Sequence, residues 1–341
     1  MSNKKNLGQF FTKNYDYILQ SLYIPENTST IVEPFCGEGD MLKFIKNREK
    51  YKIECYDIEP KNEDITKCDT LLNPPSYKDK FIITNPPYLA RNKCKNKTIF
   101  DKYDVNDLYK CFLLNLTENI CVGGIIIIPL NFWSSIRKMD IELRQKFLDI
   151  YDVLHINIFE EQVFSDTSYA VSSFQFSLKK SEINMIKIMI YPSKKEMNVL
   201  LNKENNYIIG GEIYFIDTKN SKYTVSRLIR GDKKNTNILV KCIDDNIDNK
   251  ICMKIVKDNE VFYDDTPKKS ARTYATLCID PPINDLQQEK LVKDFNEYLY
   301  NFREKYNSLF MANYRESNTI ARKRISFDLI YKIVEHLLNT F

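Results

Sequence analysis

The sequence predicts an α/β fold with a mostly parallel β-sheet and helices on both faces, followed by a mixed α+β region. Through about residue 180, short apolar runs alternate with helix-like segments, a pattern typical of parallel strands joined by crossover helices. Most of these runs are followed by turn-forming or charged residues. After residue 180 short β-like runs stand among Asn, Asp and Lys clusters, and the chain closes with a helix-rich segment.

The expected elements follow from local residue patterns. Strands are expected at residues 30–35, 52–56, 80–84, 124–130, 153–159 and 171–178. Helices are expected at residues 40–47, 106–120 and 137–150. Further β-like runs occupy residues 185–191, 207–216 and 237–243, and residues 287–341 are rich in helix. We therefore predict two domains, residues 1–180 and 181–341, each long enough to bury its own core.

Composition narrows the class of protein. With 43% hydrophobic and 28% charged residues the chain is typical of globular proteins. Its most apolar stretch, residues 125–130, is too short to cross a bilayer, so we expect a soluble, cytoplasmic protein without membrane contact. Nine cysteines without a CxxC pair and only two histidines favour neither a disulfide framework nor a zinc site.

Charge is distributed unevenly between the two halves. Residues 1–180 carry 24 Lys+Arg against 24 Asp+Glu, and residues 181–341 carry 26 against 22. The whole excess of +4 therefore lies in the second half. It indicates a modest preference for a polyanion, although an ordinary solvated surface explains it equally well.

The strongest local signal is Asn85-Pro86-Pro87-Tyr88, directly after an apolar strand. Two consecutive prolines cannot continue a sheet, so they form a stiff loop at the carboxyl end of the strand. Ligands bind at this edge of open α/β sheets.

Two further segments end strands at the same expected edge. Residues 33–40 (EPFCGEGD) follow the first strand, and their glycines let a ligand approach the backbone. Their spacing matches neither GxGxxG nor a P-loop. About twenty residues later Asp57 ends the second strand, where a carboxylate is suited to accept ribose hydroxyls. Together they predict a cofactor that contains adenosine.

Six segments in this order resemble the motifs of the gamma-class N6-adenine DNA methyltransferases, in which the recognition domain comes last. They are residues 7–12 (LGQFFT), 33–40, 56–60 (YDIEP), 85–88 (NPPY), 107–109 (DLY) with Phe112, and 163–165 (VFS). The resemblance implies a Rossmann-like sheet that binds S-adenosylmethionine, and a C-terminal target-recognition domain.

The resemblance implies site-specific methylation of N6 of an adenine that is flipped out of duplex DNA. The Asn85 side-chain oxygen and the Pro86 carbonyl would accept the amine hydrogens and direct the nitrogen to the methyl group. Tyr88 and Phe164 would stack on the two faces of the adenine. We expect a monomer, and any cognate restriction endonuclease would be a separate protein.

The resemblance also implies a set of cofactor contacts. Phe11 and Thr12 would close over the methionine end, Glu33 and the Gly37 backbone would hold its amino-acid part, and Asp57 the ribose. The cofactor-binding set implied by the family motifs is Phe11, Thr12, Glu33, Phe35, Gly37, Asp57, Ile58, Asp69 and Asn85. Of these, Asp69 would accept from the adenine amine of the cofactor.

Several residues keep a structural alternative. Asp57 also fits the end of a strand, and Asp69 fits a turn. Phe164 also fits core packing, in which case Tyr169 is the next stacking candidate. The triplet Arg322-Lys323-Arg324 fits either the solvated start of a helix or a phosphate contact.

Two other functions compete with DNA methylation. An RNA or protein-glutamine methyltransferase would use the same Asn-Pro-Pro-Tyr chemistry, but the N-terminal motif and the long C-terminal region favour DNA. An inactive DNA-binding relative would keep the fold alone, and the presence of Asn85, Tyr88 and Gly37 together argues against it.

Overall fold

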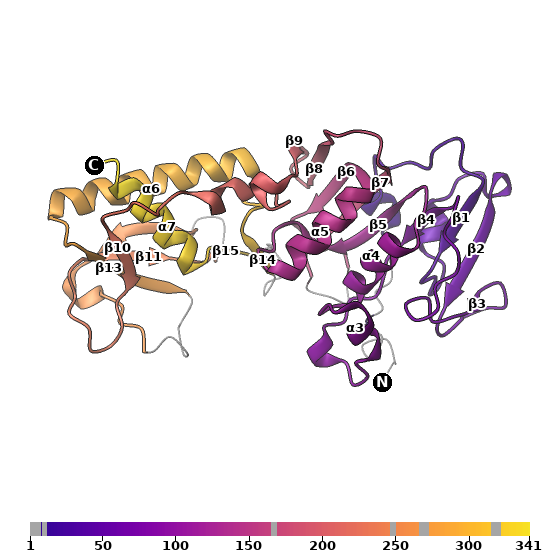
Figure 1. The fold of residues 1–341 in the computed structure, drawn as a ribbon, viewed down its shortest axis with the longest axis horizontal. Helices are drawn as coiled ribbons and strands as arrows, with labels where there is room; N and C mark the ends of the chain where they lie inside the picture. Colours follow the sequence, from indigo (N-terminus) through magenta and orange to yellow (C-terminus); the bar gives the residue numbers. More distant parts are fainter. Residues whose placement is uncertain (1–7, 9–11, 165–168, 246–249, 266–272, 315–321) are drawn as a thin grey trace. The chain divides into compact units, whose positions relative to one another are not determined.

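The computed structural model describes residues 8, 12–164, 169–245, 250–265, 273–314 and 322–341. These residues form two compact units that divide between Lys203 and Glu204, each with its own sheet and its own buried apolar residues (Figure 1). Among the helices that the structure describes, none combines the length and the apolar character needed to cross a bilayer.

The first unit is built on a nine-stranded sheet with the order β3-β2-β1-β4-β5-β7-β6-β8-β9. Its strands are β1 (Thr30–Glu33), β2 (Lys52–Asp57), β3 (Thr66–Lys67), β4 (Phe81–Thr84), β5 (Gly123–Pro129), β6 (Tyr151–Phe159), β7 (Val171–Leu178), β8 (Met185–Tyr191) and β9 (Lys195–Leu200). β1 to β5 pair in parallel, and β7 runs antiparallel between β5 and β6. The order β3-β2-β1-β4-β5 is that of a Rossmann sheet, so the predicted fold class is confirmed.

Helices cover both faces of this sheet. They are α2 (Tyr15–Ile18), α3 (Thr98–Tyr103), α4 (Leu108–Glu118) and α5 (Lys138–Ile150), with 3₁₀ turns η1 (Met41–Phe44), η2 (Arg48–Lys50), η3 (Arg91–Lys93) and η4 (Leu130–Trp133). Alternate residues of a strand point to opposite faces. In β7, Ser173 Oγ donates to Ile18 O at the end of α2, whereas the Phe174 ring packs against Trp133 and Phe147. Therefore α2 lies on one face, and η4 and α5 lie on the other.

The structure differs from the sequence prediction at two places in this unit. Within residues 40–47 only the short turn η1 forms, and it ends at Phe44 because the backbone of Ile45 is extended. Residues 185–200, assigned from sequence to the second domain, extend the first sheet. β8 pairs in parallel with β6 and β9 pairs antiparallel with β8. The division therefore lies at residue 203 rather than at residue 180.

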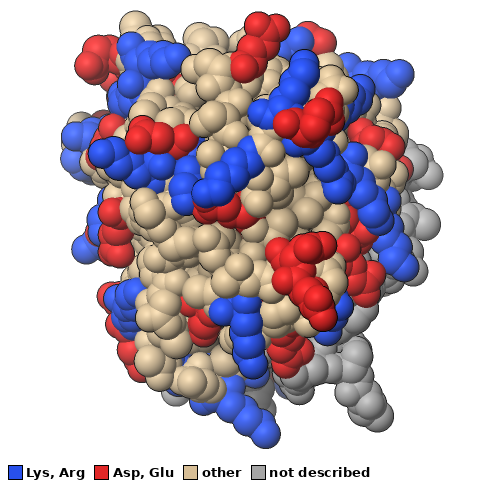
Figure 2. Space-filling model, turned by 90° about the vertical axis from the view of Figure 1, so that its right-hand side faces the viewer, with Lys and Arg blue, Asp and Glu red and all other residues tan. Residues whose placement is uncertain are grey.

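Charges of both signs are interspersed on the face of the molecule shown in Figure 2, on the side where β2 and β3 lie in Figure 1. On β2, Glu54 pairs with both Lys52 and Lys80, at 2.9 and 2.6 Å.

The second unit joins an antiparallel sheet to two helices. The sheet has the order β10-β13-β11-β12. The elements are η6 (Gly211–Phe215), β10 (Thr224–Arg227), β11 (Ile238–Lys241), β12 (Cys252–Ile255), η7 (Asp258–Glu260), β13 (Tyr274–Asp280), α6 (Asp285–Tyr306), β14 (Ala312–Tyr314), β15 (Arg322–Arg324) and α7 (Phe327–Leu338). Leu291, Phe295 and Leu299 repeat every four residues on α6, and they share one buried cluster with Ile330 and Ile333 of α7.

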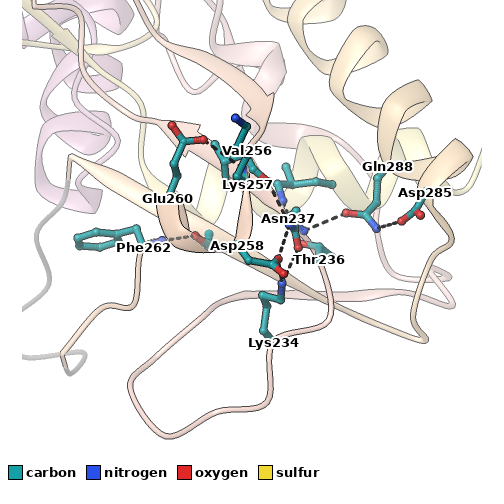
Figure 3. A network of polar contacts seen from close by, with 12 residues as sticks. Lys234, Thr236, Asn237, Val256, Lys257, Asp258, Glu260, Phe262, Asp285 and Gln288 are labelled. Carbon is teal, nitrogen blue, oxygen red and sulfur yellow. Dashed lines mark hydrogen bonds and ion pairs between the residues drawn. The ribbon is translucent and has the colours of Figure 1, made fainter.

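A polar network fixes the start of α6 against the edge of this sheet (Figure 3). The backbone N–H of Asn237 donates to Gln288 Oε1 at 3.0 Å, and its side-chain amide donates to Val256 O at 3.0 Å and Asp258 Oδ1 at 2.8 Å. Lys234 also pairs with Asp258. One asparagine therefore connects two loops and the helix.

Two expectations for this region are wrong. Residues 322–324 form the strand β15, which pairs with β14, rather than the start of a helix. Lys323 is only 4% exposed, and its carbonyl accepts from Asp244 N. Residues 207–216, expected to be β-like, contain the helical turn η6.

Candidate functional site

A cavity of about 690 Å³ opens among the residues that follow β1, β2 and β4. These strands are parallel, so their carboxyl ends meet at one edge, where α/β sheets bind ligands. Seven of the nine predicted cofactor-binding residues line the cavity, namely Thr12, Phe35, Gly37, Asp57, Ile58, Asp69 and Asn85. Of the other two, Phe11 lies outside the described residues and Glu33 is fully buried behind the wall.

Asp57 connects the loops that follow β1 and β2. One carboxylate oxygen accepts from Gly37 N at 2.8 Å and the other from Glu59 N at 2.7 Å. Gly37 has φ of +53°, a left-handed conformation that glycine adopts readily. Asp57 is only 3% exposed, yet it reaches the cavity. Since each carboxylate oxygen can accept a further hydrogen bond, Asp57 is a prearranged acceptor.

Asp69 is both a turn residue and a cavity residue. Its Oδ1 accepts from the backbone N–H groups of Leu71 and Leu72, both at 3.2 Å. The next residue, Thr70, donates its hydroxyl hydrogen to Pro34 O at 3.0 Å. These bonds hold the loop after β3 against the loop after β1. The two alternatives that the sequence offered for Asp69 are therefore compatible.

Glu33 is a buried carboxylate at the end of β1. Its Oε1 accepts from the Thr84 hydroxyl at 2.6 Å, while Oε2 has no hydrogen-bond partner among the described residues. Burial raises the pKa of Glu33 well above its usual value, because a charged carboxylate loses its hydration. A nearby cation would reverse that effect.

The N-terminal segment lies directly against the Asn-Pro-Pro-Tyr loop. Tyr88 N donates to Gly8 O at 2.9 Å. Gly8 has φ of +69°, and a Cβ atom there would lie 2.7 Å from Tyr88 O, closer than real contacts allow. Asn85 Nδ2 donates to Thr12 Oγ1 at 3.1 Å. The first and fourth resemblance segments thus meet in space.

Asn85 and Tyr88 are joined within their loop. The Tyr88 hydroxyl lies within hydrogen-bond distance of Asn85 Oδ1 and, at 2.9 Å, of Ile127 O in β5. A hydroxyl has one hydrogen, so the two oxygens share it. An amide oxygen can accept two hydrogen bonds, so Tyr88 does not by itself exhaust Asn85. The tyrosine holds the orientation of the amide.

The predicted stacking rings are buried in this structure. Tyr88 is 3% and Phe164 2% exposed, and neither lines the cavity. Tyr169 is 37% exposed, with its ring centroid 6.1 Å from that of Tyr88 in edge-to-face contact. Phe164 thus takes the core-packing alternative, and Tyr169 is the ring beside the loop.

Asp107 supports the loop from behind. It accepts from Leu89 N at 3.1 Å. Burial raises the pKa of Asp107 to about 6, although Lys110 lowers it in part. Burial is the larger cause because the carboxylate is removed from water.

Residues 91–97, which follow the Asn-Pro-Pro-Tyr loop, complete the cavity wall. The sequence did not predict this role for them. Lys93, Cys94, Lys95 and Asn96 all line the cavity. Arg91 pairs with Asp101, and Lys97 donates to Cys94 O at 2.7 Å. The run of lysines and asparagines directly after the motif was the available signal. Residues 91–97 thus bring Lys93 and Lys95 to a cavity that is also lined by the carboxylates of Glu38, Asp40, Asp57 and Asp69.

No family model matches the chain. No curated protein matches it either. Several solved structures match the chain over part of their own length. A type I restriction-modification system methyltransferase subunit from Streptococcus thermophilus is 12% identical, with a TM-score of 0.43, and the match covers 59% of this chain and 52% of that chain.

Two other similar structures contain DNA or a DNA mimic. The DrdV–DNA complex is 14% identical, with a TM-score of 0.42 and coverage of 66% and 36%. A nuclease-deletion mutant of the Type ISP restriction-modification enzyme LlaGI, in complex with a DNA substrate mimic, is 12% identical, with a TM-score of 0.41 and coverage of 64% and 32%. The chain thus spans about half or less of the length of these three structures.

Proposed function

We propose that the protein is a DNA methyltransferase that uses S-adenosylmethionine to methylate N6 of adenine at specific sites, within a restriction-modification system. The observation that carries this proposal is that Asn85 lines the same cavity as Asp57 and Asp69. An amide acceptor for an amine and a set of carboxylates for a cationic nucleoside therefore share one space.

The cavity fits the cofactor in size and charge. Its volume of about 690 Å³ lies in the range of small-molecule sites. The carboxylates of the wall complement the positive sulfonium and ammonium groups of S-adenosylmethionine, which supplies an electrophilic methyl group when bound. Asp57 would accept from the ribose and Asp69 from the cofactor's adenine. Glu33, with Oε2 unpartnered among the described residues, would hold the ammonium.

The remaining residues act on the substrate amine. The lone pair of adenine N6 is delocalised into the ring, so the amine is a poor nucleophile while it stays planar. Asn85 Oδ1 and Pro86 O would accept its hydrogens and orient the nitrogen toward the methyl group. Tyr88, through its hydroxyl bond to Asn85, would fix the angle of the amide. No metal is required by this chemistry.

The adenine must leave the duplex to reach Asn85, which costs a few kcal/mol of unstacking. Stacking on an aromatic ring returns about 1 to 3 kcal/mol. With Phe164 buried, we assign this contact to Tyr169. Tyr88 would stack only after its ring leaves the position between Asn85 and Ile127.

Recognition of the DNA sequence is assigned to the second unit, residues 204–341. The similar DrdV and LlaGI structures are complexes with DNA or a DNA mimic. We further propose that the protein acts as a monomer, with cleavage left to a separate endonuclease.

The direct test incubates the pure protein with labelled S-adenosylmethionine and long duplex DNA, then maps N6-methyladenine by sequencing. Label on adenine at one recurring sequence is the expected result. Label on RNA or on protein glutamine instead would identify the competing enzymes, and cofactor binding without transfer to any of the three would indicate an inactive relative.

A further inference from the structure

Residues 91–97 are held in place by hydrogen bonds within the segment and to the residues before α4. Arg91 N donates to Asn106 O at 2.9 Å, which joins the start of the segment to the start of the helix. The Lys97 ammonium donates to Cys94 O at 2.7 Å and also to Arg91 O. One lysine thus closes the segment on itself, so its backbone has a defined course along the cavity.

Two other lysines of this segment are not used in that way. Lys93 and Lys95 line the cavity and are exposed. Among the residues that the structure describes, neither ammonium group forms a hydrogen bond or an ion pair. Arg91, by contrast, pairs with Asp101 at 2.5 Å. The segment therefore presents two positive groups that an external anion can reach.

Positive and negative groups of the cavity differ in depth. Asp40 and Asp57 are only 7% and 3% exposed, and Asp69 is half-buried, so that Glu38 is the exposed carboxylate of the four. An exposed side chain that lines a cavity lies at its mouth, and both lysines are of this kind. A cationic ligand is thus favoured in the interior, and an anionic group is favoured at the mouth beside the lysines.

We propose that Lys93 and Lys95 bind the phosphodiester groups next to the target adenine, an assignment that rests on the proposed function. A nucleotide whose base reaches Asn85 keeps its phosphates at the mouth, because a phosphate that enters the interior loses its hydration. Lysine ammonium groups bind phosphate oxygens there through charge-assisted hydrogen bonds. Such contacts position the strand without reading its sequence, which is left to the second unit.

The test measures how binding of a short fluorescein-labelled oligodeoxyadenylate to the full-length protein depends on salt, by fluorescence anisotropy. A single strand presents adenines that need not leave a duplex. Lys93→Gln and Lys95→Gln should each reduce the slope of log affinity against log salt concentration by about 0.7, the contribution of one phosphate contact in a single strand. Lys78→Gln alters an exposed lysine of the same unit that does not line the cavity, and it should leave the slope unchanged.

A second oligonucleotide of the same sequence carries uncharged methylphosphonate linkages. It should bind the wild type and the two cavity variants with equal affinity, because it has no phosphate charge for the lysines to neutralise. Calorimetry with S-adenosylmethionine should also give equal affinities for the three proteins. A loss of affinity for S-adenosylmethionine without a change in slope would assign the lysines to the cofactor's carboxylate and overturn the proposal.

Equal salt slopes in the wild type and both cavity variants would also overturn the proposal, as would a wild type that does not bind the charged oligonucleotide. None of these measurements uses methyl transfer. Binding through Lys93 and Lys95 in a protein that transfers no methyl group to DNA would contradict the proposed function and leave the phosphodiester site. Methyl transfer to DNA with unchanged slopes would contradict only the role of the two lysines.

Discussion

Buried carboxylates are held in two ways in this molecule: by cations, as in the second unit and at Lys110–Asp140 of the first, and by backbone N–H groups at the cavity of the first unit. In the second unit, Arg303 forms two hydrogen bonds to Asp244, at 2.6 and 3.1 Å, and Arg227 pairs with Asp264 at 3.2 Å. In the first unit, Asp57 is held by backbone N–H groups and faces an open cavity. A carboxylate held by backbone dipoles can take an external partner, whereas one held by a cation already has its partner. The first arrangement serves a ligand and the second serves the fold.

Asn85→Ala should have the largest effect, because it removes the acceptor on which the proposed chemistry depends. We expect the rate of methyl transfer to fall about a thousandfold, or about 4 kcal/mol of barrier, with cofactor affinity nearly unchanged. Single-turnover assays with labelled S-adenosylmethionine measure the rate, and calorimetry measures the affinity. Asn96→Ala, which alters another cavity asparagine, is the control. Equal losses in the two variants would remove the special role of Asn85.

Asp244→Ala should destabilise the second unit by about 3 kcal/mol, because it leaves the Arg303 guanidinium largely buried without its carboxylate. Urea unfolding followed by circular dichroism measures the change. Lys290→Ala breaks the more exposed pair Lys290–Asp294 and should cost less than about 0.5 kcal/mol. If the two variants cost the same, burial would not make the Arg303–Asp244 pair more stabilising than the exposed pair.

Asp57→Ala should weaken binding of S-adenosylmethionine about thirtyfold, equivalent to about 2 kcal/mol. The variant loses an acceptor and frees the loop at Gly37. Asp64→Ala, an exposed aspartate of the same unit, should bind within about twofold of the wild type. Calorimetric titration separates the outcomes, and unchanged affinity in Asp57→Ala would place the ligand elsewhere.

Asp107→Asn should have the smallest effect, visible as a change in pH dependence. The pKa of Asp107 is raised by burial from 3.8 to about 6, so between these values the folded state binds the proton more tightly than the unfolded state. Stability from this group is therefore full below about pH 4 and is lost as the pH rises through about 6. The amide does not ionise in this range, so it should remove that decline. Melting temperatures from pH 4 to 7 should then fall less in the variant than in the wild type.

Much of the first sheet could be predicted because its strands carry local signals. β4 is an apolar run that ends just before Asn85-Pro86-Pro87, and β5 contains four consecutive isoleucines and ends at Pro129. The carboxyl ends of parallel strands share one edge of a sheet, so the sequence alone could predict that Asp57 and Asn85 lie near each other.

The remaining features depend on contacts distant in sequence. Whether the ring of Tyr88 points into a core or a cavity depends on neighbours such as Ile127 and Tyr109. β8 and β9 resemble the β-like runs that follow them, and only pairing with β6 assigns them to the first sheet. For the triplet at residues 322–324 the sequence left open the start of a helix or a phosphate contact, and only pairing with β14 assigns it to a strand.

The place of β8 and β9 has a practical consequence for dissecting the chain. A shortened protein that ends at residue 180 would lack β8 and β9, so β6 would become the edge strand of the sheet. Ile156 and Ile158 of β6, which are fully buried in the whole chain, would then be exposed. Unpaired apolar edges recruit other chains, so such a fragment should aggregate. Ending after Lys203 instead keeps β9 as the outer strand, with Lys195 and Glu196 along it, charges of the kind that discourage edge-to-edge association.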